Sequence, residues 1–123
     1  MERISKDEYF YEMARVVARR ATCPRRSVGA VIVSATGRVL TTGYNGSLSG
    51  SPHCTDVECE IVDGHCQRAI HAEVNAVAQA AIYGVSLQGS KLYLYTSGNP
   101  VPPCRECTKV LLAAGVDITS AMP

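Results

Sequence analysis

The chain of 123 residues is long enough for one globular domain and too short for two of ordinary size. Its formal net charge of +1 gives no long-range field for holding a polyanion, so a small substrate is favoured over a nucleic acid or a membrane surface. No apolar run approaches the roughly 20 residues that cross a bilayer, and the first residues carry acids where an export signal would be apolar. We expect a single cytoplasmic domain over residues 1–123.

The first third of the chain predicts one helix followed by a β-hairpin. Ser5 followed by Glu8 is a capping box, and apolar side chains then recur at helical spacing, so a helix is expected over about residues 5–20. Two runs rich in β-branched residues, 27–33 and 38–43, are separated by the turn sequence Ala-Thr-Gly. These two runs are therefore expected to pair as antiparallel strands.

The rest of the chain predicts a long loop and then alternating helices and strands. Residues 43–67 are rich in Gly, Ser, Pro, Asp and Cys, which makes them too polar for a core and too long for a connection without an anchor. A helix is expected over about 69–83, a strand over 91–96, a helix over 104–114 and a short strand over 116–119. Two strands joined through a helix form a parallel crossover, so we expect an α/β fold with a mixed sheet flanked by helices.

Two pairs of chemically active side chains stand at the starts of the last two expected helices. His71 and Glu73 open one of them, and Cys104 and Cys107 open the other. With six cysteines and no export signal, thiols are expected to serve as metal ligands or in catalysis rather than in disulfides. Cysteines three residues apart share a helix face, and the free N–H groups of a first turn lower a thiol pKa, so both sulfurs are expected to be thiolates at neutral pH.

Two thiolates and one imidazole supply three ligands for a zinc ion and leave the fourth position for water, as in catalytic sites. Zinc lowers the pKa of water from about 15.7 to about 7, which removes about 12 kcal/mol from the cost of hydroxide near neutral pH. A carboxylate such as Glu73 then accepts the water proton and delivers protons to a ring nitrogen and a departing amine, a role worth about 10²- to 10⁴-fold. Hydrolytic deamination needs this set of groups, with Glu73 as the catalytic residue and His71, Cys104 and Cys107 as zinc ligands.

His-x-Glu followed by Pro-Cys-x-x-Cys resembles the signature of the zinc-dependent nucleobase and nucleotide deaminases. The chain is similar over nearly its whole length to the deoxycytidylate (dCMP) deaminases of bacteria and phages, through the stretches VGAVIV, GYNG, PHC, GHCQRAIHAEVNA and PCRECTKVLLAAGV. The resemblance implies a three-layer α/β/α cytidine-deaminase-like fold around a five-stranded mixed sheet. It also implies hydrolysis of dCMP to dUMP and ammonia in pyrimidine nucleotide metabolism, and a hexamer under allosteric control by dCTP and dTTP.

Two segments depart from the family pattern. The stretch TSGNPVPPC is longer than the usual connection between strand and Pro-Cys. The chain ends at Pro123, where the family continues into a further helix and strand. We expect a fold with a short C-terminal part, either a minimal enzyme or a truncated one, in which substrate and oligomer contacts of that tail are affected.

The remaining cysteines form a second cluster with two histidines beside them: Cys23, Cys54, Cys59, Cys66, His53 and His65. Four thiols in or beside polar, glycine-rich sequence favour a closed structural zinc over buried apolar cysteines, and such an ion would anchor the long loop. The resemblance supports Cys23 and Cys54 most strongly as its ligands. The other two ligands stay open among Cys59, His65 and Cys66.

Three further residues are candidates for contact with a nucleotide. Asn45 in Gly-Tyr-Asn-Gly suits a left-handed turn, whereas the resemblance implies contact with the sugar of the substrate. A 5′-phosphate needs charge-assisted hydrogen bonds worth about 1.5–3 kcal/mol each, and a basic pair just ahead of the first strand suits it. Of that pair we favour Arg26, with Ser47 as a weaker additional contact.

Two alternative functions share parts of this pattern. Other zinc deaminases, which act on tRNA adenosine, cytosine, guanine or the riboflavin precursor, also carry His-x-Glu and paired cysteines. A zinc-ribbon-like binding module, in which all six cysteines are structural, belongs to a different class and has no use for Glu73. Selectivity for dCMP over CMP or 5-substituted analogues depends on the shape of the pocket, which no motif encodes.

Overall fold

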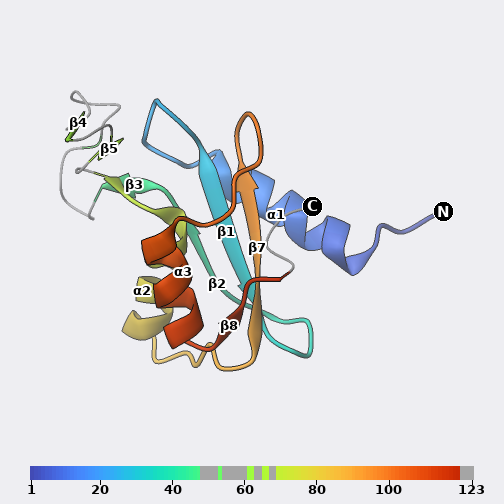
Figure 1. The fold of residues 1–123 in the computed structure, drawn as a ribbon. Helices are drawn as coiled ribbons and strands as arrows, with labels where there is room; N and C mark the ends of the chain where they lie inside the picture. The colour runs from blue at the N-terminus through green and yellow to red at the C-terminus, as the bar shows by residue number, and fades with distance from the viewer. Residues whose placement is uncertain (48–52, 54–60, 63–64, 67–68, 120–123) are drawn as a thin grey trace.

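The computed structural model of the chain describes residues 1–47, 53, 61–62, 65–66 and 69–119 (Figure 1). The elements in chain order are α1 (Lys6–Ala18), β1 (Val28–Val33), β2 (Val39–Tyr44), β3 (Gly46–Ser47), β4 (Ile61–Val62), β5 (His65–Cys66), β6 (Ala69–Ile70), α2 (Ala72–Ile82), β7 (Ser90–Thr96), α3 (Arg105–Ala113) and β8 (Val116–Asp117). Four of these strands form the main sheet, in the order β2-β1-β7-β8. β1 is antiparallel to β2 and β7, and β8 is parallel to β7, so the sheet is mixed as expected.

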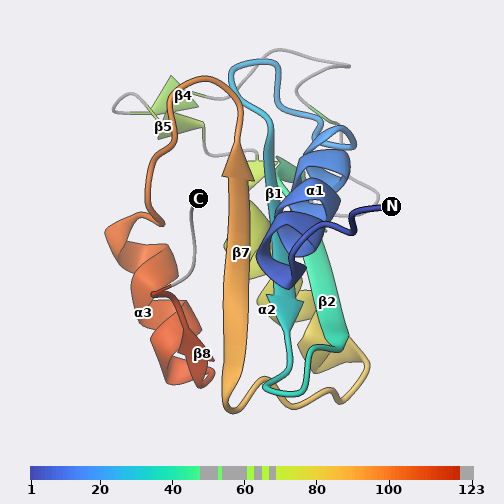
Figure 2. The same cartoon turned by 90° about the vertical axis from the view of Figure 1, so that its right-hand side faces the viewer.

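Helices cover both faces of this sheet (Figures 1 and 2). Side chains alternate along β1: Val31 and Val33 join the cluster under α1, whereas Ala30 and Ile32 join the larger cluster under α2 and α3. The expected three-layer α/β/α arrangement is therefore confirmed. Within the described residues the main sheet has four strands, where the family resemblance implied five. None of the helices in the described part of the chain is long and apolar enough to span a membrane.

The sequence placed most elements within two residues, but two expectations between β2 and α2 were wrong. The helix expected over 69–83 begins three residues later, because Ala69–Ile70 pairs with Gly46–Ser47 as the strands β6 and β3. The stretch expected to be a loop also contains the antiparallel pair of β4 with β5. Both strand pairs lie between β2 and α2 in the sequence.

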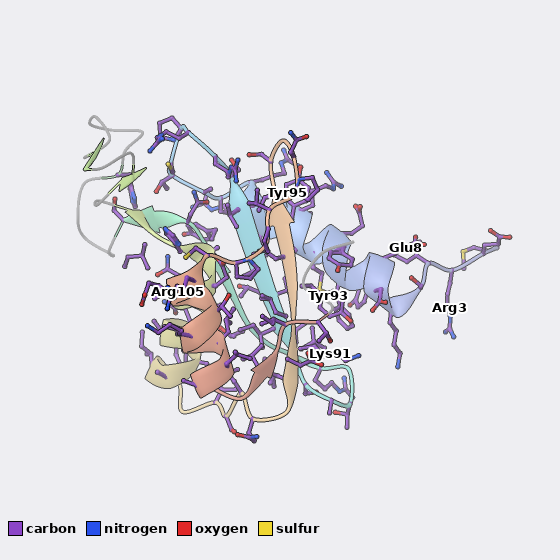
Figure 3. The ribbon with its side chains drawn as sticks, in the orientation of Figure 1. Arg3, Glu8, Lys91, Tyr93, Tyr95 and Arg105 are labelled. Carbon is purple, nitrogen blue, oxygen red and sulfur yellow. The ribbon has the colours of Figure 1, made fainter. Side chains whose placement is uncertain are left out.

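Tyr93 links α1 to the sheet through a hydrogen bond and ring packing, on the face opposite α2 (Figure 3). Its hydroxyl donates to the Asp7 Oδ1 atom over 2.7 Å, and its ring centroid lies 5.1 Å from those of Phe10 and Tyr11. Burial, and then the neighbouring Asp7 carboxylate, raises the pKa of Tyr93 to about 12. The phenol is thus held in its neutral, donating form well above the ordinary tyrosine pKa.

Replacing this phenol tests that link. Tyr93→Phe keeps the ring packing but removes the hydrogen bond, so we expect the free energy of unfolding to fall by about 1–2 kcal/mol at neutral pH. In the wild type the contribution of the neutral phenol is fully present below pH 10 and is lost as the pH rises toward 12, because the unfolded chain gives up this proton first. Tyr93→Phe should lose less stability than the wild type between pH 10 and 12, because the phenylalanine has no proton to give up. Urea denaturation at pH 7, 9 and 11 measures both effects, and equal stabilities at pH 7 would contradict the role of Tyr93.

Candidate active site

The starts of α2 and α3 lie near each other at one end of the layer that both helices form (Figure 1). His71 is the N-cap of α2, with φ −65° and ψ 148°, and Cys104 is the N-cap of α3, with φ −66° and ψ 169°. Both caps are extended, so these two side chains precede the helices rather than belong to their first turns. Cys107 lies in the first turn of α3, where its backbone N–H donates to the Cys104 Sγ atom over 3.5 Å.

The three predicted zinc ligands converge at this point. His71 Nδ1 lies 3.2 Å from Cys107 Sγ and 3.5 Å from Cys104 Sγ, and all three atoms lie within 4.8 Å of one another. In a tetrahedral zinc site, with Zn–N near 2.0–2.1 Å and Zn–S near 2.3 Å, such atoms stand about 3.6 Å apart. Both the spacing and the donor set of one imidazole and two thiols therefore fit a single zinc ion.

The buried environment of Cys107 corrects one expectation from the sequence. Cys107 is 1% exposed, and this burial, followed by the charge of the adjacent Glu73, raises the pKa of its thiol. The N–H groups of the first helical turn therefore do not make this sulfur a thiolate by themselves. A metal ion has that effect, since a coordinating thiol is deprotonated outright, so metal uptake here is expected to release protons.

Glu73 is the second residue of α2 and is 5% exposed. Burial raises the pKa of its carboxyl group above the ordinary value, while the nearby His71 and Cys107 act in the opposite direction. A buried carboxyl group with a raised pKa, next to a set of metal ligands, is well suited to accept and return a proton near neutral pH.

Two hydrogen bonds between the edge strand β2 and α2 hold α2 in place. The Thr41 Oγ1 atom donates to the carbonyl oxygen of Ala76 over 2.9 Å, and Asn75 Nδ2 donates to the carbonyl oxygen of Tyr44 over 2.8 Å. Together they fix the helix that begins with the candidate catalytic residues. No local sequence pattern marks Thr41 and Asn75, because their hydrogen bonds join segments more than 30 residues apart.

Gly43 sets how closely α2 approaches the sheet. A methyl carbon added there would lie 2.4 Å from both the carbonyl oxygen of Ala72 and the amide nitrogen of Ala76, so α2 would have to move. We expect Gly43→Ala to lower zinc affinity by about 10- to 100-fold, measured by competition with a chelator, because α2 carries the zinc-binding end. The free energy of unfolding of Gly43→Ala should be lower than that of the wild type by about 1–3 kcal/mol.

Gly29→Ala is the matched control for that variant. Its added methyl carbon would lie 2.1 Å from the carbonyl oxygen of Ala14, in α1, on the opposite face of the sheet. We expect a similar loss of stability with a much smaller change in zinc affinity. Equal changes in zinc affinity for the two variants would contradict the role given to Gly43.

A cleft of about 420 Å³ opens onto this group of residues. Its lining includes His71, Glu73 and Cys104, together with apolar side chains from the sheet and from the segment before α3. Two of the three predicted substrate contacts, Arg26 and Asn45, line the same cleft. Ser47 is absent from the described lining of this cleft.

The second predicted cluster is described only in part. Cys23 is a free, partly exposed thiol that lines the cleft. Cys54 and Cys59 lie outside the described residues, and for Cys66 and His65 only the backbone of β5 is described. The buried Nδ1 atom of His53 has no hydrogen-bond partner among the residues that the structure describes.

A family model described as the cytidine and deoxycytidylate deaminase zinc-binding region matches residues 4–122. The chain belongs to this family. ComE operon protein 2 of Bacillus subtilis (strain 168) is 44% identical over 116 residues, which are 94% of this chain and 58% of that protein. The deoxycytidylate deaminase of Schizosaccharomyces pombe is 34% identical over 122 residues, and the chain spans 36% of its length.

Other deaminases of this family match over more of their length. The deoxycytidylate deaminase of Mycobacterium phage D29 is 33% identical over 129 residues, covering 95% of this chain and 94% of that protein. A crystal structure of the dCMP deaminase of the cyanophage S-TIM5, in complex with dCMP and dUMP, has a TM-score of 0.76 and 31% identity over 94% of this chain and 79% of that one. The deaminase fold expected from the sequence is thus confirmed for this family member.

Proposed function

We propose that this chain catalyses the zinc-dependent hydrolytic deamination of dCMP to dUMP and ammonia. The observation that carries the proposal is the convergence of His71, Cys104 and Cys107 beside the buried Glu73 at a cleft. The similarity to named deoxycytidylate deaminases, and to a dCMP deaminase solved with dCMP and dUMP, supports dCMP as the substrate.

The residues of the site divide the reaction between them. Zinc held by His71 Nδ1 and the two cysteine sulfurs supplies, when bound, the electrostatic activation of a water molecule near neutral pH. Glu73 accepts the proton of the water that attacks C4 of cytosine. It gives this proton to the ring nitrogen N3. It then takes the proton of the hydroxyl group now on C4 and passes it to the departing amine, so that the amine leaves as neutral ammonia and C4 becomes a carbonyl carbon.

The rest of the cleft holds the nucleotide. Arg26 binds the 5′-phosphate through charge-assisted hydrogen bonds, and Val28 and Leu94 give the base an apolar wall. Asn45 borders the sugar. Its side-chain amide makes two hydrogen bonds to the backbone, which leave one hydrogen and one lone pair for such a contact.

Two further parts of the proposal rest mainly on the family resemblance. A second, structural zinc is held by Cys23, Cys54, Cys59 and Cys66, with His65 as the alternative ligand. The buried Nδ1 atom of His53, which finds no partner within the described part of the chain, supports a metal site in this region, since such an atom is costly without a partner. The enzyme assembles as a hexamer and responds to dCTP and dTTP.

The experiment that tests the function measures ammonia from dCMP, deoxycytidine, dCTP and cytosine in parallel, with and without dCTP and dTTP as effectors. We expect dCMP to be the preferred substrate. Equal rates for dCMP and deoxycytidine would overturn the role given to Arg26. No ammonia from any cytosine or adenine compound would overturn the enzymatic function and favour a zinc-binding module.

A further inference from the structure

Side chains replace backbone acceptors on both sides of the start of β1. The ladder of β1 with β2 pairs Gly29 with Tyr44, and one step further the Val28 amide donates to the side-chain Oδ1 atom of Asn45 over 2.9 Å. On the other side, beyond the last pair of β1 with β7, the Ser27 amide donates to the Oγ atom of Ser97 over 2.9 Å. Two side chains thus hold the chain where it enters the sheet.

Asn45 holds both ends of the segment before β1. Its Nδ2 atom donates to the carbonyl oxygen of Arg26 over 2.7 Å, and its own carbonyl oxygen accepts from the Thr22 amide over 3.1 Å. Asn45 is 8% exposed, so these bonds are shielded from competing water. A short side-chain amide offers a donor and an acceptor on separate atoms, which gives a physical reason for asparagine at this position.

Ser97 closes the same segment from the side of β7. Besides accepting from the Ser27 amide, it donates its own N–H to the carbonyl oxygen of Ser27 over 2.8 Å. Residues 23–27 belong to no helix or strand, and they present Arg25 and Arg26 to the cleft. The backbone that carries these two arginines is therefore held by the side chains of Asn45 and Ser97, in addition to backbone bonds from the Asn45 amide to the Val28 carbonyl oxygen over 3.3 Å and from the Ser97 amide to Ser27.

We propose that Asn45 and Ser97 are positioning residues, which clamp the backbone of Arg26 and Ser27 and thereby give the site its selectivity for a nucleotide that carries a 5′-phosphate. This inference rests on the proposed function, in which Arg26 binds that phosphate. A long, flexible arginine side chain gains binding free energy only to the extent that its anchoring backbone is already ordered. The clamp supplies that order before the substrate arrives.

The readout is phosphate discrimination, which is kcat/KM for dCMP divided by kcat/KM for deoxycytidine. Ser97→Ala removes one hydroxyl acceptor that is not among the groups lining the cleft, and we expect discrimination to fall at least about threefold. Ser97→Thr keeps the hydroxyl and should restore it. In the matched control, Ser34→Ala, the lost hydroxyl accepts from the Arg38 amide over 3.0 Å in the turn at the other end of β1, and discrimination should not change. An unchanged ratio in Ser97→Ala would overturn the clamp.

Asn45→Ala separates positioning from direct contact with the sugar. A residue that only touched the sugar would weaken dCMP and deoxycytidine alike and leave their ratio unchanged, whereas the clamp predicts that the ratio falls about tenfold. In the Arg26→Ala background the effects of Asn45→Ala and Ser97→Ala on the ratio should disappear, because both act through Arg26. Full additivity with Arg26→Ala would overturn the proposal.

Hydrogen exchange gives a readout that does not depend on turnover. In the ligand-free protein we expect Ser97→Ala to raise amide exchange in the segment 23–28 and Ser34→Ala to leave it unchanged. No rise in exchange would overturn the clamp even in an active enzyme. Conversely, a rise in exchange together with no deaminase activity would support the clamp as a structural device and overturn the proposed function, so the two failures are distinguishable.

Discussion

Glu73→Gln is expected to reduce ammonia release from dCMP by about 10²- to 10⁴-fold while leaving the zinc content unchanged. Glutamine has the same shape as glutamate, so it fits the same buried position, but its amide cannot accept and return protons. Because burial raises the pKa of Glu73, a charged group is held there at a cost, and a neutral replacement should leave the melting temperature unchanged or higher. An ammonia assay, metal analysis and thermal unfolding measure the three quantities.

Glu106→Gln is the matched control for this substitution. Glu106 also lies in the first turn of a helix, but its side chain is exposed and pairs only loosely with Lys109, over 3.4 Å. Such a surface pair contributes little, so activity should stay within about twofold of the wild type. If Glu73→Gln kept full activity, the proton-transfer role would be wrong, and if it lost zinc together with activity, Glu73 would be part of the metal site instead.

Cys107→Ser is expected to lose one zinc ion per chain and to reduce activity by more than about 100-fold. Replacing a residue that only hydrogen-bonds to a metal ligand typically already lowers metal affinity or activity by about 10- to 100-fold. The Cys107 sulfur is buried and lies 3.2 Å from His71 Nδ1, so its loss removes a ligand that no neighbouring residue is placed to replace among the described ones. A serine hydroxyl does not become the anionic ligand that zinc prefers. Metal analysis of the purified protein, with the ammonia assay, measures both losses.

Zinc counting also tests the second metal site. With two zinc ions in the wild type, Cys107→Ser should retain one, and Cys23→Ser, the matched thiol replacement in the other cluster, should lose the other. A wild-type content of one zinc would remove the second site from the proposal. Full zinc content and full activity in Cys107→Ser would contradict the ligand set of the first site.

Local patterns were enough to predict the elements that carry the site. Ser5 caps α1 as expected, with its Oγ atom accepting from the Glu8 amide over 3.1 Å. The His-x-Glu and Cys-x-x-Cys patterns predict that both residue pairs lie at helix starts, and the caps at His71 and Cys104 confirm that position. Such signals succeed because a helix start depends on a few neighbouring residues.

The features that the sequence did not reveal depend on distant contacts. The sequence predicts the start of α2 three residues too early, because Ala69–Ile70 is locally compatible with a helix. In the structure it pairs as a strand with Gly46–Ser47, more than 20 residues earlier in the chain. The raised pKa of the Cys107 thiol follows from packing around α3, which no spacing rule reports. The sequence predicts a turn or a substrate contact for Asn45, whereas its side-chain amide also binds the backbone of Arg26 and Val28.

Hydrolysis by a water molecule next to Glu73 is tested most directly by isotope transfer. When dCMP is incubated with the zinc-loaded protein in H₂¹⁸O, mass spectrometry should detect dUMP carrying one ¹⁸O atom, with one ammonia per dUMP. The same incubation with Glu73→Gln should give almost none. Absence of labelled dUMP with the wild type, or equal labelling with the variant, would contradict the proposed chemistry.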